Sequence, residues 1–213
     1  MKRIFQSMAL SALVLVGLVG CDYDSRVVKD TNPVRVAEMQ RSLRDLWLGH
    51  IYWMQHAVLN NALNSSAKQA AAETEVLANA KQIASAVTSY YGEARSEALF
   101  TLLIDHIAAL KEYSKATIEG NTPQQDEALA RLASNSDDIA VFLNGVNPHH
   151  LSKDTVRGLI AAHVAHHVLQ INQYKRKEYA KLDETWPMMR QHVYDIADCL
   201  TIALVKQFPS QFS

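Results

Sequence analysis

Apolar residues recur at intervals of three and four through most of this chain, and this spacing predicts α-helices rather than β-strands. Only 7 Gly and 5 Pro occur in 213 residues, which is few for a turn-rich β fold. Start and stop signals divide the pattern into six predicted helices, over about residues 34–64, 70–91, 96–119, 123–144, 153–182 and 187–208. The sequence therefore predicts one all-α domain over residues 34–213.

Part of the helical pattern is repeated along the chain. The segment around Leu77 and Ile83 matches the segment around Leu132 and Ile139, and the match continues into the following helix of each pair. The second and third predicted helices thus resemble the fourth and fifth. We expect an up-and-down bundle with an internal helix-pair duplication. The first, third, fifth and sixth helices would form a ferritin-like four-helix core, with the other two as accessory helices.

The first twenty residues have the form of an export signal. Two basic residues, at positions 2 and 3, precede an apolar run that is shorter than the roughly 20 residues of a spanning helix. The run ends in Leu18-Val19-Gly20-Cys21, which resembles the lipobox of bacterial lipoproteins. This resemblance implies cleavage before Cys21 and acylation of its thiol and of the new amino terminus. An ordinary signal peptide, or a membrane helix with a chance cysteine, is the alternative.

The predicted organisation is a signal peptide over residues 1–20, a lipidated cysteine with a polar tether over 21–33, and the helical domain over 34–213. Several acyl chains would give stable membrane attachment in the cell envelope. In enteric-type lipoproteins, an Asp such as Asp22 after the lipidated cysteine implies the periplasmic face of the inner membrane, with the outer membrane as the alternative. The formal net charge of −1 provides no basic excess for nucleic-acid binding. The sequence leaves open whether the protein binds a partner protein in the cell envelope.

The histidines are the strongest chemical signal in the sequence. The chain has 9, and several lie on the apolar stripes of different predicted helices. A neutral imidazole is a good ligand for Zn, Cu, Fe or Ni, and a carboxylate three residues away could orient the ring. If the helices converge, the sequence predicts a buried site for one of these metals or for non-covalent haem. Its candidate residues are His50, His106, His163, His167, His192 and Asp195.

Two other interpretations of the histidines stay open. Each could be a core residue that bonds a backbone carbonyl, in a structural or protein-interaction lipoprotein. A His-dependent oxidoreductase is the third interpretation. The sequence has no Glu-x-x-His, Cys-x-x-Cys-His, His-Glu-x-x-His, nucleophile elbow or phosphate-binding glycine loop. The leading prediction is therefore a non-enzymatic lipoprotein that binds a metal or haem.

The order of several motifs resembles a little-characterised family of small helical proteins from bacteria and some archaea. These motifs are L-W-x-x-H-x-x-W at residues 46–53, two turn-linked helix pairs that each carry a histidine, and K-Q-F-P at residues 206–209. Members often carry glycosyltransferase or acetylglutamate kinase names that no motif supports. The resemblance covers residues 43–212 and implies an all-helical fold with no established reaction. It favours His50, His106 and His163 over the other histidines. The family has Thr-Arg after the second Trp, whereas this chain has Met54-Gln55.

Overall fold

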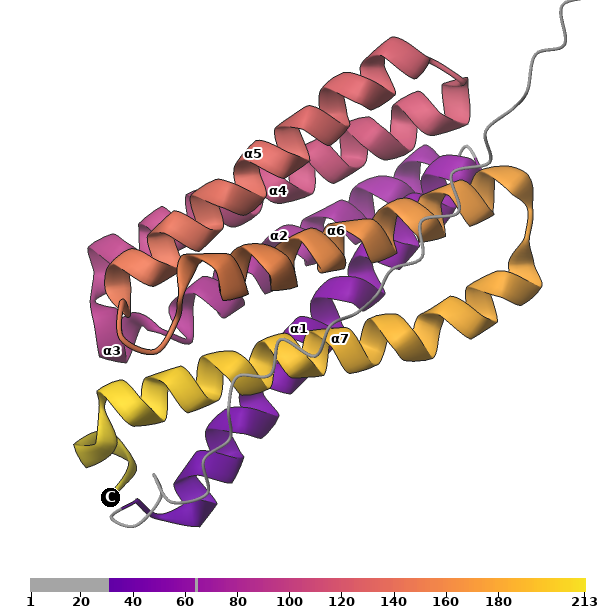
Figure 1. Ribbon diagram of the computed structural model, residues 1–213. Helices are drawn as coiled ribbons and strands as arrows, with labels where there is room; N and C mark the ends of the chain where they lie inside the picture. The colour runs from indigo at the N-terminus through magenta and orange to yellow at the C-terminus, as the bar shows by residue number, and fades with distance from the viewer. Residues whose placement is uncertain (1–30, 64) are drawn as a thin grey trace, which may run out of the picture.

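The computed structural model describes residues 31–63 and 65–213, and this part of the chain is helical without any strand (Figure 1). The predicted signal segment and Cys21 lie outside the described residues. The elements are α1 (Pro33–Ala62), α2 (Ser66–Ser85), α3 (Thr88–Tyr91), α4 (Glu93–Glu119), α5 (Thr122–Val146), α6 (Lys153–Arg176), α7 (Tyr179–Gln207) and a final 3-10 turn (Pro209–Phe212). The prediction of an all-α helical bundle is confirmed.

The six long helices form an up-and-down bundle, because short connections reverse the chain after each one (Figure 1). They contact one another in a closed ring in the order α1, α2, α4, α5, α6 and α7. In addition, α1, α4 and α6 contact each other across the middle of the ring. Three helices rather than the expected four therefore meet at the centre. The other three are outer helices: α2 lies between α1 and α4, α5 lies between α4 and α6, and α7 lies between α6 and α1.

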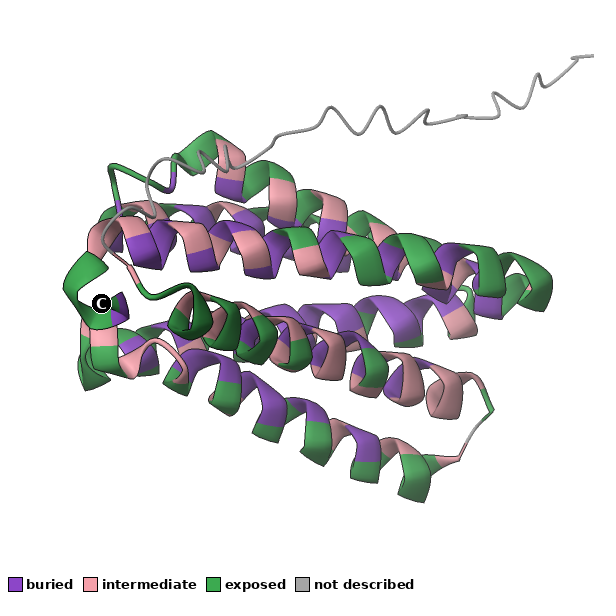
Figure 2. Ribbon diagram, turned by 90° about the horizontal axis from the view of Figure 1, so that it is seen from below, coloured by how far each residue is buried: buried purple, intermediate pink, exposed green. Residues whose placement is uncertain are grey.

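The three central helices line the bundle axis at equivalent positions. On each of them, two apolar residues and a histidine are spaced by four and then three residues, so all three side chains lie on one helical face. All nine of these residues are buried, and buried residues elsewhere in the bundle likewise face inward (Figure 2). The sets are Leu43, Trp47 and His50 on α1, Leu99, Leu103 and His106 on α4, and Val156, Ile160 and His163 on α6.

Each outer helix is held to the preceding central helix by one side-chain hydrogen bond to a backbone carbonyl. The donor lies 33 residues after the acceptor in all three cases, and the acceptor lies four residues before the inward-facing histidine. The hairpins α1–α2, α4–α5 and α6–α7 are thus built alike in this respect. The predicted duplication of a helix pair itself stays a prediction. The bonds run from Asn79 to Leu46, from Asn135 to Leu102 and from His192 to Leu159.

The boundary between α6 and α7 differs from the predicted one. The chain leaves α6 at Lys177, which adopts a left-handed conformation with φ of 57°, and Glu178 donates its backbone N–H back to Gln173. This is a helix cap that usually has glycine at the left-handed position, and no glycine signals it here. Pro187, the predicted start of the last helix, lies inside α7. Its ring is tolerated because the carbonyl that loses a hydrogen bond, that of Asp183, belongs to an exposed residue.

Candidate metal centre

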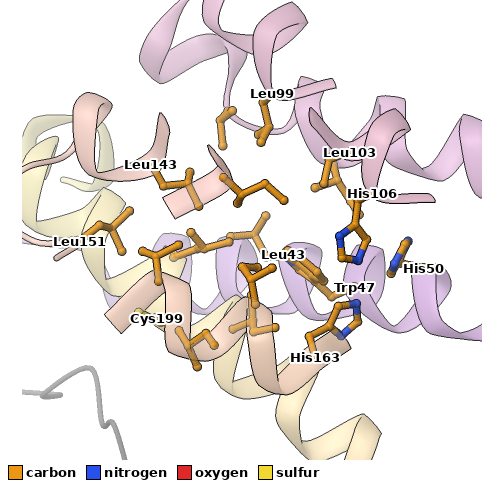
Figure 3. Close-up of a pocket in the computed structure, with 18 of the residues that line it drawn as sticks. Leu43, Trp47, His50, Leu99, Leu103, His106, Leu143, Leu151, His163 and Cys199 are labelled. Carbon is orange, nitrogen blue, oxygen red and sulfur yellow. The ribbon is translucent and has the colours of Figure 1, made fainter. Parts of the chain in front are cut away.

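Three buried imidazoles, one each from α1, α4 and α6, meet on the bundle axis (Figure 3). His50, His106 and His163 each contribute one ring nitrogen to a group whose members lie within 4.8 Å of one another. The ring centroids are 5.5 Å apart for His50 and His163, and 5.8 Å apart for His106 and His163. The sequence prediction that these three residues converge is therefore confirmed by the geometry, and we call them the histidine triad.

A hydrogen bond from α5 fixes the orientation of the His106 ring. The Asn135 side chain donates through Nδ2 to the Leu102 carbonyl at 3.0 Å, which leaves its Oδ1 as an acceptor. The Nδ1 of His106 lies 2.9 Å from this oxygen and must therefore carry the proton. The lone pair of His106 is consequently on Nε2, which has no partner among the described side chains and backbone groups. A carbonyl behind the ring is the usual support for a histidine that binds a metal.

The nitrogens of His163 and His167 have no hydrogen-bond partner within residues 31–63 and 65–213. Both side chains are nearly inaccessible to solvent, with exposed fractions of 1% and 0%. Buried polar atoms are almost always satisfied, and leaving one unsatisfied costs about 1–3 kcal/mol. The unsatisfied nitrogens of these two adjacent rings are therefore available to bind another group.

All of these imidazoles are neutral at physiological pH. Burial lowers the pKa of His50 to about 3, with a smaller contribution from His106. Burial also holds the pKa of His163 and His167 well below the usual value, and neighbouring histidines reinforce the effect. The pKa of His106 is lowered by burial as well, although its bond to Asn135 opposes this. Neutral rings keep the lone pairs that a metal ion needs.

The two sides of the triad differ in character. On one side, an apolar cavity with about 50 Å³ of space for the centres of water-sized molecules runs along the axis (Figure 3). Trp47 packs edge-on against the triad, with its ring centroid 5.7 Å from that of His163. On the other side lies His167, one helical turn beyond His163, with ring centroids 4.6 Å apart. The buried Oε1 of Gln170 also lacks a partner among the described residues.

The structure does not bring the other two predicted site residues to the triad. His192 uses Nε2 to bond the Leu159 carbonyl at 2.8 Å, and its ring centroid lies 6.5 Å from that of His163. Asp195 is exposed and accepts a hydrogen bond from Gln191.

Two polar groups at the site were missed in the sequence analysis. Asn135 is a buried amide on the apolar face of α5, between Leu132 and Ile139. A polar residue on an apolar face was the sequence signal that could have identified it. The indole N–H of Trp47 is buried with no acceptor in the described part of the chain, and no sequence pattern distinguishes it from a core tryptophan.

Comparison of the chain with models of protein families, with curated proteins and with solved structures found no match. The geometry of the triad and its surroundings therefore carries the functional argument.

Proposed function

We propose that this protein binds one divalent transition-metal ion through His50, His106 and His163. The observation that carries the proposal is the convergence of three neutral, buried imidazoles from three different helices on one point. Histidine is the commonest nitrogen ligand of Zn, Cu, Fe and Ni, and three histidines are an established ligand set for zinc.

The observed spacing suits a single ion. Metal–nitrogen bonds of about 2.0–2.1 Å in tetrahedral geometry place the ligand nitrogens roughly 3.3 Å apart. The triad nitrogens lie within 4.8 Å of one another. Small rotations of the side chains are enough to close this difference. The support of His106 by Asn135 already holds one ring with its lone pair available.

Haem fits this arrangement less well than an ion does. A porphyrin needs a wide flat slot between two axial ligands. Here His50, His106 and His163 surround one point from three helices, and Trp47 packs against two of them. The adjoining cavity offers only about 50 Å³. The proposal therefore names the ion.

A structural role for the triad has weaker support. Core histidines that stabilise a fold through hydrogen bonds need partners, as His192 has at the Leu159 carbonyl. Neither ring nitrogen of His163 has one in the part of the chain that the structure describes. No carboxylate lines the adjoining cavity either, so the proposal is binding rather than acid–base catalysis.

We further propose that the bundle is anchored to the cell envelope through an acylated Cys21. The proposal rests on the lipobox-like sequence at residues 18–21. Among the described residues, no helix is both long and apolar enough to cross a membrane. Incorporation of labelled palmitate into the full chain is expected, and it should be lost in Cys21→Ser. Labelling that persists in this variant contradicts the anchor without affecting the metal site.

Metal content tests the main proposal directly. The full chain, purified in detergent with a tag that contains no histidine, is analysed for bound metals and then titrated with Co²⁺. We expect one ion per chain and the intense visible bands of a low-symmetry, four- or five-coordinate Co²⁺ site. His163→Leu should remove the bands. The matched control is the double variant His149→Ala and His150→Ala, which removes two exposed histidines from the connection between α5 and α6 and should leave the bands unchanged.

The control decides between a built site and surface binding. If cobalt binding disappears in the double variant and persists in His163→Leu, the ion binds the exposed histidine pair and the proposal is wrong. A protein that takes up no Zn²⁺, Cu²⁺, Co²⁺, Ni²⁺ or Fe²⁺, and shows no thermal shift with any of them, also contradicts it.

A further inference from the structure

The apolar cavity beside the triad is the feature of this bundle that packing alone does not explain. It is lined by side chains from all six long helices, and Leu43, Leu99 and Leu103 are among the lining residues together with the three histidines (Figure 3). Val156 and Ile160 also line it. Protein cores are normally packed without voids larger than a water molecule. A cavity on the axis, closed at one end by three imidazoles, therefore needs an explanation of its own.

Its position relates it to the coordination of an ion. The cavity lining includes His50, His106 and His163 and excludes His167. An ion held by the triad therefore has the cavity on one side. Three protein ligands leave at least one coordination position of a transition metal open, and a fourth ligand is then supplied by a small molecule.

We infer that the coordination position left open by the triad faces this cavity and takes a small uncharged ligand of diatomic size, such as nitric oxide or carbon monoxide. This inference rests on the proposed metal site. The chemical class follows from the lining, because beyond the histidines and Trp47 every lining residue is aliphatic or is Cys199. A charged ligand would lose its hydration there without gaining a compensating partner.

The size of the cavity sets the upper limit on the ligand. A cavity of about 10–15 Å³ holds a water molecule, and one of about 150 Å³ holds benzene. About 50 Å³ is thus sufficient for a diatomic molecule and insufficient for an aromatic ring.

Trp47 contacts the triad, lines the cavity and carries a buried polar group. Its ring lines the cavity and packs edge-on against His50 and His163, and its indole N–H is buried without an acceptor among the described residues. A diatomic ligand on the ion offers a weak acceptor to a donor of this kind. The tryptophan is therefore a positioning residue for the ligand.

Nitric oxide is the probe for this inference. The full chain is loaded anaerobically with Fe²⁺, its iron content is measured, and nitric oxide is added. We expect the electron paramagnetic resonance signal of a high-spin ferrous nitrosyl complex in a stoichiometry close to one per bound iron. Leu103→Phe fills the cavity and should reduce that signal at least tenfold at equal iron content. The matched control is Ile104→Phe, the same change at the next residue of α4, whose side chain is 38% exposed.

The outcomes separate the two proposals. Iron uptake without a nitrosyl signal in the wild type overturns this inference and leaves the metal site intact. No uptake of Fe²⁺ or of any other ion overturns the proposed function and this inference together. A full signal in an iron-loaded Leu103→Phe protein also overturns the inference, since the ligand then reaches the ion without the cavity. If Leu103→Phe fails to fold, Leu143→Phe fills the cavity from α5, and the wild-type result is decisive by itself.

Discussion

Replacing His163 with leucine is expected to stabilise the metal-free protein, although the residue is one of the most buried in the bundle. Its exposed fraction is 1%, and neither ring nitrogen has a hydrogen-bond partner among the described residues. Two unsatisfied nitrogens cost about 2–6 kcal/mol in total, at about 1–3 kcal/mol each. Leucine is close to histidine in size and removes both, while imperfect packing takes back up to about 1.5 kcal/mol.

The net gain for His163→Leu is therefore about 0.5–6 kcal/mol in the free energy of unfolding. For a bundle of this size, roughly 3 °C of Tm accompanies each kcal/mol, so Tm should rise by about 2–18 °C. Thermal melts followed by circular dichroism in the presence of a chelator measure this. With metal present at about 100 times its Kd, the wild type should gain about 2.7 kcal/mol and the variant should gain nothing.

His192→Leu is the matched control, because His192 is also a buried histidine but donates to the Leu159 carbonyl. Loss of this hydrogen bond should cost about 0.5–1.5 kcal/mol and lower Tm, the opposite sign to His163→Leu. If metal-free His163→Leu melts below the wild type by several degrees, the imidazole stabilises the core in the absence of metal. The reasoning from unsatisfied nitrogens is then refuted.

The metal-free protein should lose stability as the pH falls below about 6.5, because an unfolded histidine binds a proton near that pH whereas the pKa of folded His50 is about 3. Each buried histidine of this kind contributes about 1.4 kcal/mol per pH unit within that window, and urea titrations from pH 7 to 4.5 should show a slope above one proton. Asn135→Ala should weaken Co²⁺ binding about 10–100-fold, since His106 loses the acceptor behind its ring, and an unchanged affinity would show that this bond does not support the site. Lys177→Gly should raise the urea midpoint by an amount equivalent to about 0.5–1 kcal/mol, because glycine adopts the left-handed conformation without a Cβ penalty, and a lowered midpoint would contradict this.

The sequence predictions that succeeded were those that rested on the periodic spacing of apolar residues along each helix. Spacing by three and four residues placed Trp47, His50, His106 and His163 on buried faces, and all four are buried in the structure. Helix periodicity is a local property, so the sequence could reveal it. The end of α6 was missed because Lys177 adopts a conformation that the sequence signals only when glycine occupies the position.

The histidines show where local reasoning stops. His167 and His192 both lie on buried faces, yet His167 lies beside the triad and His192 bonds a carbonyl of the neighbouring helix. His192 lies 33 residues after Leu159, its hydrogen-bond acceptor, just as Asn79 lies 33 residues after Leu46. This shared spacing distinguishes His192 from His167, but it could be interpreted only from the three-dimensional structure of the hairpins.

Local patterns in the sequence were enough to show that this chain is helical, which face of each helix is apolar, and that histidines occupy those faces. These three properties can be found from a rotation of about 100° per residue, which needs no information about other helices. That α1, α4 and α6 share the axis, and that their histidine rings meet beside an apolar cavity, became visible in three dimensions. The rotation and axial offset of each helix are set by how its side chains pack against distant segments, and no local pattern encodes that.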